Sequence, residues 1–275
     1  MLKISGFRRE NGQFGVRNYL LILPTSVCAS DTAAKIAAQV PGAIAVPNQH
    51  GCCHIGYDLT QTVMTLEGFG KNANVGAVLV VGLGCEGIQA EALADKIKTS
   101  GKLVDFIIIQ KCGGTLKAIS QGVEKAAKMA AVLATQPRVE GDVSDIILGL
   151  ECGGSDPTSG LASNPAIGYV SDKLVNLGGT SILSETTEVI GAEHLLATRF
   201  ADENQRVKFL RMVKECEGRA IKLGADLRNG QPTPGNKEGG ISTIEEKSLG
   251  CMYKAGVSPF QAALEYAEWV PSKKG

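Results

Sequence analysis

Short apolar runs alternate with longer amphipathic segments along the first half of the chain. The runs at Val75–Val81 and Val104–Ile109 are almost continuously apolar, which is typical of strands buried on both faces of a parallel sheet. Tyr19–Leu23 and Ala43–Val46 are shorter runs of the same kind. Apolar residues at helical spacing predict the helices of this half, which are Asp31–Val40, Gln89–Ser100 and Leu116–Thr135.

The alternation continues after a polar connector at Gln136–Asp142. The predicted strands of the second half are Asp145–Leu150 and Thr180–Ser184, and the predicted helices are Ala166–Leu177, Thr187–Leu196, Asp202–Leu223, Ser242–Ala255 and Pro259–Trp269. Arg228–Gly240 is rich in Gly, Pro and Asn and predicts a long functional loop. The repeated strand–helix order predicts an α/β fold of doubly wound, mostly parallel, Rossmann-like sheets in two units, residues 1–137 and 138–275.

The composition is that of a folded globular protein. The chain has 275 residues, of which 44% are hydrophobic, and this length is ample for a buried core. Lys plus Arg and Asp plus Glu are equal at 28 each, so the basic excess of a nucleic-acid binder is absent. Residues 1–10 contain no apolar signal segment, and the apolar runs are too short to span a bilayer. We therefore expect a cytoplasmic protein without membrane or nucleic-acid partners.

Most of the cysteines lie just after a predicted strand, namely Cys28, Cys52, Cys53, Cys85, Cys112 and Cys152. A cytosolic setting disfavours disulfides, and the chain has no CxxC pair of the zinc-ribbon kind. Ligands of open α/β sheets bind at the carboxyl ends of the strands, so these loops can converge on one site. Any single cysteine could equally be a small buried hydrophobe. Their shared position favours a site.

Two loops carry the strongest candidate chemistry. Gln49–His54 (QHGCCH) holds two of the three histidines and two cysteines, whose side chains suit Fe²⁺ or Zn²⁺. With Glu86 or Glu151 nearby, they could form an open catalytic metal site. The alternative is that only one of them is functional and the others support the loop. Gly82–Gly87 (GLGCEG) has the spacing of a dinucleotide site, but the next strand ends in Gln110-Lys111 and lacks the acidic residue that such a site needs.

Short motifs occur in a fixed order along the whole chain. They are Gly15–Asn18, Pro24-Thr25, His50–Cys52, Gly82–Glu86, Cys152–Asp156, Ser159-Gly160, Ala162–Ala166, Ser184-Glu185, Pro234–Lys237, Gly239-Gly240 and Glu246–Gly250. This series resembles the altronate/galactarate dehydratase family, which includes the large subunit of sulfolactate sulfo-lyase. The resemblance covers essentially the whole chain as the family's second domain and part of its C-terminal domain.

The resemblance implies a hydro-lyase that removes water from a sugar acid such as altronate or galactarate and leaves a 2-keto-3-deoxy acid. Family enzymes are described as using iron or another divalent ion, so we expect Fe²⁺, with Mn²⁺ or Mg²⁺ as alternatives. A divalent ion stabilises the negative charge that develops when a base removes the proton α to a carboxylate. An acid then protonates the leaving hydroxyl.

Chemistry and motif position together give the candidate residues. The predicted metal ligands are His50, Cys52, Cys85 and Cys152. The predicted catalytic groups are His50, Glu86, Glu151 and Glu185. The predicted substrate contacts are Arg17, Ser155, Asp156, Asn164, Asn236 and Lys237. Arg17 is included because arginine suits bidentate binding of a carboxylate.

Other functions remain open. Family enzymes often carry a small N-terminal domain, sometimes as a separate subunit, and their C-terminal domain continues beyond this chain. The chain could therefore be a fragment, a truncated form or a genuinely short member, and a small partner subunit is possible. We also expect a homo-oligomer. One alternative is the large subunit of a sulfolactate sulfo-lyase, and another is an incomplete subunit that needs a partner chain for turnover. A thiol-based redox or iron–sulfur protein is favoured only by the cysteine count.

Overall fold

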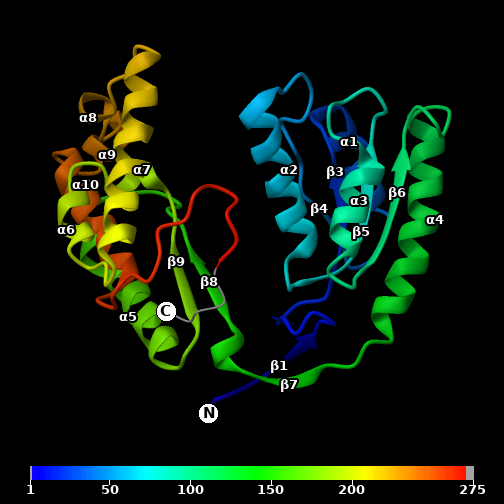
Figure 1. Cartoon of the computed structure of the whole chain (residues 1–275), viewed down its shortest axis with the longest axis horizontal. Coiled ribbons are helices and arrows are strands. Elements are labelled where there is room, and N and C mark those ends of the chain that lie inside the picture. The colour runs from blue at the N-terminus through cyan, green and yellow to red at the C-terminus, as the bar shows by residue number, and fades with distance from the viewer. Residues whose placement is uncertain (1, 271–275) are drawn as a thin grey trace. The chain divides into compact units, whose positions relative to one another are not determined.

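A computed structural model describes residues 2–270, which form two compact units (Figure 1). The first unit comprises Lys3–Gly141 with Tyr266–Trp269, and the second consists mainly of Asp142–Glu265. Within the described residues, we find no helix with the length and apolar character that a membrane crossing requires. Each unit has its own sheet and its own set of helices.

The first unit is built on a four-stranded parallel sheet in the order β4-β3-β5-β6. The strands are β3 (Tyr19–Pro24), β4 (Ala43–Ala45), β5 (Val75–Gly82) and β6 (Leu103–Ile108). Every residue of β5 is buried, as its continuous apolar run predicts for a central parallel strand. The predicted α/β class with parallel strands is therefore confirmed.

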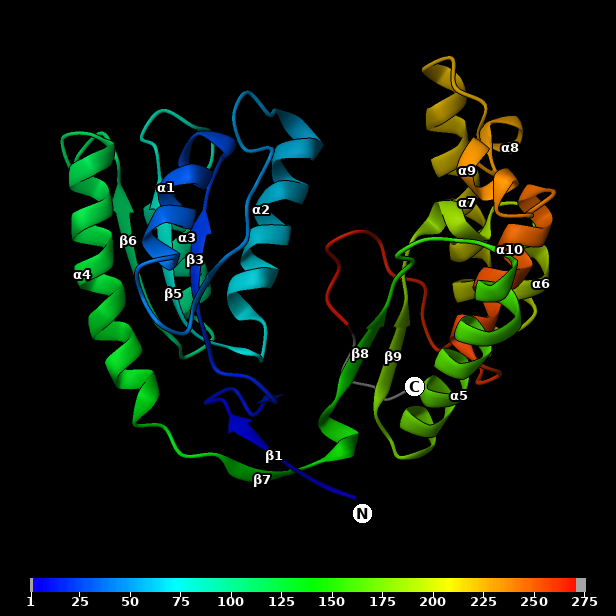
Figure 2. The same ribbon diagram turned by 180° about the vertical axis from the view of Figure 1, so that it is seen from behind.

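Helices cover both faces of this sheet (Figure 2). They are α1 (Val27–Ala37) and α4 (Thr115–Ala134) on one face, and α2 (Gly56–Lys71) and α3 (Ala90–Lys98) on the other. Successive side chains of a strand point to opposite faces. Leu20 and Ile22 of β3 accordingly join the core beneath α1 and α4, while Leu21 and Leu23 join the core beneath α2 and α3.

Several elements of the first unit lie where the sequence predicts none. They are α2 and the three strands of a small sheet, β1 (Lys3–Arg8), β2 (Phe14–Gly15) and β7 (Val139–Asp142). Only Leu66 and Gly70 of α2 are buried, while Leu59 and Val63, at helical spacing from Leu66, are partly buried against the same core, so the apolar stripe of α2 is narrow. The segment predicted as a connector contains β7. Helix α1 begins four residues before its predicted start, which puts Cys28 in its first turn.

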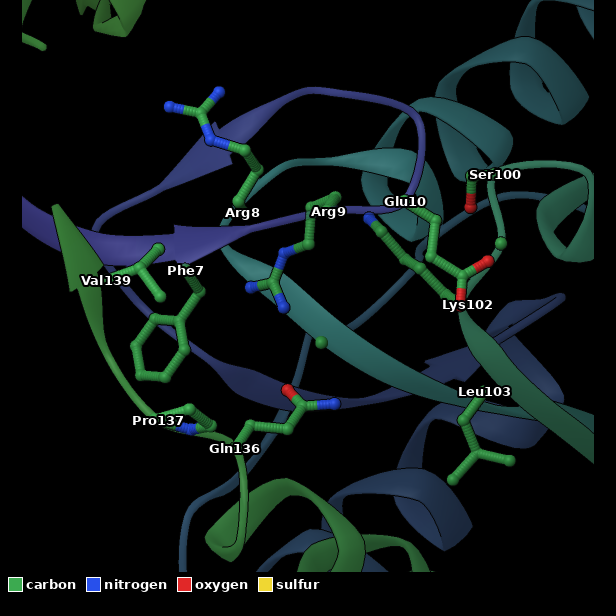
Figure 3. Close-up of a pocket in the computed structure, with 12 residues that line it drawn as sticks. Phe7, Arg8, Arg9, Glu10, Ser100, Lys102, Leu103, Gln136, Pro137 and Val139 are labelled. Atoms are coloured by element: carbon green, nitrogen blue, oxygen red, sulfur yellow. The ribbon is translucent and has the colours of Figure 1, made fainter. Parts of the chain in front are cut away.

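Two buried cations fix the end of α2 beside the sheet. Arg9 Nε donates to the Ala73 carbonyl (2.8 Å), and Lys102 Nζ donates to the carbonyls of Gly70 (3.0 Å) and Asn72 (2.5 Å). Cations are favourable there because a helix C-terminus carries partial negative charge. Both residues are 8% exposed and line a pocket of about 340 Å³ (Figure 3). Among the residues that the structure describes, none of the predicted site residues lines this pocket.

We predict that Lys102 makes the stability of the protein depend on pH. Burial, and then the nearby charge of Arg9, lower the pKa of Lys102 to about 7. A lysine in the unfolded chain titrates near ~10.4, so between these values the unfolded chain holds a proton that the folded chain has released. The unfolding free energy should therefore rise with pH, relative to a Lys102→Met variant, by up to about 1.4 kcal/mol per pH unit.

Denaturant titrations of wild type and Lys102→Met at several pH values between about 6 and 10 measure this difference. Lys98→Met is the matched control, because Lys98 lies on the surface of α3 and pairs only with Asp95 in the described contacts. An identical pH dependence of wild type and Lys102→Met would contradict the prediction.

The second unit has a two-stranded parallel sheet of β8 (Ile147–Leu150) and β9 (Thr180–Leu183), connected through α5 (Asn164–Asn176). Its other helices are α7 (Glu203–Lys222), α10 (Ile244–Met252) and the short α6 (Glu193–Ala197), α8 (Leu227–Gly230) and α9 (Pro234–Glu238). Single helical turns lie at Val143–Asp145, Ser159–Ser163, Thr186–Val189 and Tyr253–Ala255. Apolar side chains of the second unit form a separate core around Ile190, Leu196 and Val213.

Three predictions for the second unit were wrong. The expected helix Pro259–Trp269 is irregular, because the Phe260 ring stacks on Phe200 and its backbone bonds to Arg199 and Ala201. The expected helix Thr187–Leu196 is interrupted at Gly191, whose φ of +105° is incompatible with a right-handed helix. The predicted loop at 228–240 contains two short helices, α8 and α9.

Close packing around Gly168 of α5 leads to a prediction about stability. A Cβ at Gly168 would lie 2.0 Å from the Tyr253 carbonyl oxygen, so Gly168→Ala should lower the unfolding free energy by about 1–3 kcal/mol. Gly218 of α7 has no neighbour within 4 Å, and Gly218→Ala should raise it by about 0.5–1 kcal/mol. Denaturant titration of both variants checks this, and a Gly168→Ala variant as stable as Gly218→Ala would contradict it.

Candidate functional site

Three loops meet at the carboxyl end of the first unit's sheet, where β3, β4 and β5 end. The Asn48 side-chain amide donates to the Thr25 carbonyl (3.2 Å), and Asn48 Oδ1 accepts from the His50 amide (2.9 Å). The His50 carbonyl accepts from the Val27 amide at the start of α1 (2.9 Å). Gly51 has a φ of +88°, and a Cβ there would lie 2.2 Å from the Thr25 carbonyl oxygen. The loop after β4 is therefore fixed against the end of β3.

The carboxylate of Glu86 joins the ends of β3 and β5. It accepts hydrogen bonds from the Thr25 hydroxyl (2.7 Å) and from the amides of Leu83 (2.8 Å) and Gly84 (2.6 Å). Glu86 is only 5% exposed. Burial opposes its charge, but the hydroxyl and the two amides outweigh that effect and hold the pKa of Glu86 below its usual value. Glu86 is thus an ionised, fully bonded group that shapes the loop bearing Cys85.

Replacing this carboxylate should destabilise the first unit. We predict that Glu86→Gln lowers the unfolding free energy at neutral pH by about 1–3 kcal/mol, because an amide cannot accept from all three donors. The difference should shrink as the pH falls through the lowered pKa of Glu86, since the stability from a depressed carboxyl pKa is lost there. Thermal or denaturant unfolding measures it, with Glu91→Gln on the surface of α3 as control. A Glu86→Gln variant as stable as that control would refute the prediction.

The predicted residues His50, Cys52 and Cys85 lie on these loops. Cys52 Sγ is 3.8 Å from the sulfur of Cys53, and the ring centroid of His50 is 5.2 Å from that of His54. Cys85 is exposed between Gly84 and Glu86. The predicted contact Arg17 lies instead just before β3, at the opposite end of the strands, and its side chain is exposed.

The second unit contains a pocket of about 430 Å³ at the carboxyl end of β8. Its walls are the loop after β8, the start of α5 and one side of α10. Five predicted residues line it, namely Glu151, Cys152, Ser155, Asp156 and Asn164. The structure thus places residues of the ECGGSD motif around one cavity.

A cysteine and two glutamates come together beside this pocket. The Cys152 amide donates to Glu185 Oε2 (2.6 Å), and Cys152 Sγ lies 3.3 Å from the Ser155 hydroxyl. Glu185 follows β9 with a left-handed backbone (φ +68°). Cys152, Glu185 and Glu188 each offer one ligand atom, and these atoms lie within 4.8 Å of one another. One thiol and two carboxylates are a donor set that suits borderline divalent ions such as Fe²⁺.

Two lysines balance these carboxylates. Lys254 Nζ lies 3.8 Å from Glu185, and its side chain is 3% exposed. Burial opposes the charge of Lys254, but its neighbours Cys251, Cys152 and Glu188 raise its pKa above the ordinary value. Lys247 Nζ lies 3.5 Å from Glu188 and also reaches the side-chain oxygens of two amides, Gln231 (3.1 Å) and Asn236 (3.4 Å). Both lysines line the pocket.

The remaining predicted substrate contacts mostly hold the walls of the pocket. The side-chain amides of Asn236 and Asn164 each donate to a backbone carbonyl at 2.8 Å, of Ser155 and Gly250 respectively. Asp156 accepts from the Thr158 hydroxyl and from backbone amides, which lowers its pKa. Lys237 is exposed on α9.

Three residues of this candidate site were not singled out from the sequence. Lys247 lies inside the Glu246–Gly250 motif, so its position was available as a signal. Glu188 follows Glu185 by three residues, the spacing of one helical turn, but the predicted helix there gave no reason to pair them. Lys254 carried no signal, because only the tertiary fold brings it to Glu185.

The predicted metal ligands do not all lie in one unit. His50, Cys52 and Cys85 belong to the first unit, whereas Cys152 belongs to the second. Within the described residues, the one group of three ligand atoms in mutual reach is that of Cys152 in the second unit.

Comparison with known proteins identifies the family. Residues 6–134 match the family described as D-galactarate dehydratase/altronate hydrolase, second domain, and residues 143–275 match D-galactarate/altronate dehydratase, C-terminal. The chain belongs to the altronate/galactarate dehydratase family. The resemblance drawn from the ordered motifs is therefore confirmed.

Three family members illustrate the similarity. The altronate dehydratase of Escherichia coli K12 is 37% identical over 273 residues, which are 95% of this chain and 54% of that protein. The (2R)-sulfolactate sulfo-lyase subunit beta of Chromohalobacter salexigens is 36% identical over 91% of this chain and 64% of that protein. The galactarate dehydratase (L-threo-forming) of E. coli K12 is 33% identical over 78% of this chain and 42% of that protein. The chain thus spans about half the length of the altronate dehydratase it matches.

Proposed function

We propose that this chain carries the catalytic core of a hydro-lyase that dehydrates a sugar acid such as altronate or galactarate to a 2-keto-3-deoxy acid. Membership of the dehydratase family supports the reaction class. The observation that carries the proposal is the cluster of two glutamates, one thiol and two lysines beside a pocket of about 430 Å³.

The reaction requires removal of a weakly acidic proton. A base takes the proton at C2, the C3 hydroxyl leaves as water after protonation, and the resulting enol becomes the 2-keto acid. The proton at C2 is acidic only if the charge that spreads onto the neighbouring carboxylate is stabilised. Ammonium groups at the site meet this need, and we assign Lys247 and Lys254 to it.

We propose Cys152, Glu185 and Glu188 as the residues that hold a divalent ion. Their donor set and mutual reach fit Fe²⁺, with Mn²⁺ and Mg²⁺ as alternatives. Such an ion would supply additional positive charge to stabilise the anion that develops on the substrate. Glu151, exposed on the pocket wall, remains the candidate base from this unit. Roles for His50 and Glu86 in acid–base catalysis remain predictions.

The wider setting of the chain is also a proposal. We infer that the sheet of the first unit is Rossmann-like, since its helices cover both faces and its strand order reverses beside β3. The domain division at residues 137 and 138, a cytoplasmic location and a homo-oligomer are retained as expectations. A partner subunit is consistent with the relative that is named a subunit beta.

A second candidate is sulfo-lyase activity on sulfolactate. The relative named (2R)-sulfolactate sulfo-lyase subunit beta is matched over 64% of its length, a larger share than for either dehydratase above. The two lysines of the same pocket, Lys247 and Lys254, would bind a carboxylate next to a leaving sulfonate. Release of sulfite rather than water distinguishes this reaction from dehydration.

The experiment is a substrate screen with the whole chain. Altronate, galactarate and (2R)-sulfolactate are each supplied with Fe²⁺, Mn²⁺ or Mg²⁺, with and without the small domain of a family relative. Keto-acid formation and sulfite release are measured. Product from the chain alone would exclude an incomplete subunit, and no product under any condition would reject the proposed activity.

We predict that Glu185→Gln lowers kcat by about 10²–10⁴-fold, because it removes a charged ligand and an orienting group of the Cys152 loop. Glu215→Gln is the control, since Glu215 is exposed on α7 and is absent from the described pocket lining. Thermal melts of both variants separate a catalytic loss from misfolding. A folded Glu185→Gln variant with the wild-type rate would refute the assignment.

A further inference from the structure

The pocket of about 340 Å³ in the first unit lies at the amino end of its sheet, where β5 and β6 begin (Figure 3). We call it the amino-end pocket. Its walls come from the end of β1, the turn between α3 and β6, and the segment that leads into β7. Its volume is within the range of small-molecule sites, about 300–1,000 Å³. The proposed dehydration chemistry of the second unit makes no use of it.

Two buried cations come together on the wall of this pocket. Arg9 Nε donates to the Ala73 carbonyl (2.8 Å), and Lys102 Nζ donates to the carbonyl of the preceding residue, Asn72 (2.5 Å). Because carbonyls of consecutive residues bind them, the guanidinium and the ammonium lie close together. Both residues are 8% exposed. The acceptors that they bond are uncharged oxygens, those of the Gly70, Asn72, Ala73 and Arg17 carbonyls and of the Asn18 side chain.

The end of α2 compensates only part of this positive charge. A helix C-terminus carries about half an elementary negative charge, whereas Arg9 and Lys102 bring two full positive charges. Buried charges are ordinarily paired with an opposite charge. The pKa of Lys102 reflects the shortfall, since burial, and then the charge of Arg9, lower it to about 7. Arg8 and Glu10 on the same wall offset each other, so an anion with two negative charges would balance the pocket.

Each of the two cations retains hydrogen-bond donors for such an anion. A lysine ammonium has three N–H donors, and Lys102 uses two of them on carbonyls. A guanidinium has five N–H donors, and Arg9 uses three of them, one on each nitrogen. The described contacts therefore leave one donor of Lys102 and two donors of Arg9 for a ligand in the pocket that both residues line.

A carboxylate on the wall restricts the kind of anion that fits. Glu10 lies against Gly101, the residue before Lys102, where a Cβ would collide with the Glu10 carboxylate. An ionised carboxylate only accepts hydrogen bonds, so it repels a ligand whose oxygens are all acceptors. A ligand hydroxyl, in contrast, can donate to it. Hydrogen phosphate combines the two features that the wall calls for, namely two negative charges and a hydroxyl donor.

We propose that the amino-end pocket is a binding site for a phosphate group, with Arg9 and Lys102 as its charge partners and Glu10 as the acceptor of a ligand hydroxyl. Inorganic phosphate and a small phosphate ester share this chemistry, because a hydroxyl on the carbon chain of the ester can take the place of the phosphate hydroxyl. The first unit alone forms the site. It stands or falls independently of the sugar-acid chemistry assigned to the second unit.

Calorimetric titration of the whole chain with inorganic phosphate tests the proposal. A Lys247→Met background removes one ammonium group of the second unit's pocket, and a slightly alkaline pH keeps phosphate chiefly as the hydrogen phosphate dianion. We expect one equivalent of phosphate to bind. Sulfate, a dianion without a hydroxyl, should bind at least about tenfold more weakly, because it cannot donate to Glu10. Glycerol phosphate is the second arm, and the tighter of the two phosphates identifies the free ion or an ester as the ligand.

Two variants in this background separate the contributions of charge and of the hydroxyl acceptor. Lys102→Met should weaken phosphate binding about tenfold or more, whereas Lys98→Met, on the surface of α3, should leave it unchanged. Glu10→Gln should abolish the preference for phosphate over sulfate, since an amide can also donate to sulfate, and Glu91→Gln should preserve that preference. Circular dichroism and thermal melts confirm folding. Glu10 is exposed, so Glu10→Gln decides the question if Lys102→Met unfolds.

Three outcomes would overturn the inference. They are the absence of phosphate binding in the Lys247→Met background, equal phosphate affinities of folded Lys102→Met and Lys98→Met, and a preference for phosphate that survives Glu10→Gln. Failure of the proposed dehydration would affect none of these results, since binding is measured without a sugar acid. A chain that binds phosphate in the amino-end pocket but turns over no sugar acid would keep this inference and reject the proposed function.

Discussion

The connections that follow the strands of a parallel sheet all emerge at the same edge, because parallel strands end on the same side. In the first unit, helices also bury both faces of the sheet, and the central strand β5 has no polar side chain. Reactive residues are therefore confined to the loops at that edge. The QHGCCH and GLGCEG segments and the start of α1 meet there for this topological reason.

Glu86 shows how the constraint is met locally. A loop that leaves a buried strand exposes backbone amides, and such groups are costly unless they are bonded. The Glu86 carboxylate accepts from two of these amides and from the Thr25 hydroxyl of the adjacent connection. One buried charge thereby sets the conformation of the segment that carries Cys85 and joins the ends of β3 and β5. Glu86, predicted from the sequence as a catalytic group, has an evident structural task.

Elements with a periodic apolar pattern could be predicted from the sequence, whereas elements that depend on contacts between distant residues could not. The apolar run at Val75–Val81 predicted β5 almost to the residue, since burial on both faces leaves a local signature. Helix α2 was missed although Leu59, Val63 and Leu66 lie at helical spacing, since this apolar stripe is narrow and only Leu66 of the three is buried. Pro259–Trp269 has helical spacing, but its Phe260 is used in a ring stack and a backbone bridge to the segment after α6. A local sequence pattern does not reveal such contacts between distant residues.

The same distinction applies to the candidate site. The ECGGSD motif is contiguous, so the sequence could group its residues, whereas Lys254 reaches Glu185 only through the fold.

Charge balance links this arrangement to the proposed substrate. Glu185 and Glu188 face two ammonium groups, so these four charges cancel without an ion. The two ion pairs, at 3.8 and 3.5 Å, are longer than strong charge-assisted hydrogen bonds, and the lysines are therefore not firmly committed to the glutamates. With a divalent ion on the glutamates, the ammonium groups of Lys247 and Lys254 would be free to pair with a ligand, beside the other acidic residues of the pocket wall, Glu151, Asp156 and Glu246. Two ammonium groups favour an anionic ligand with more than one oxygen donor, and a sugar acid with its carboxylate and hydroxyls has this character.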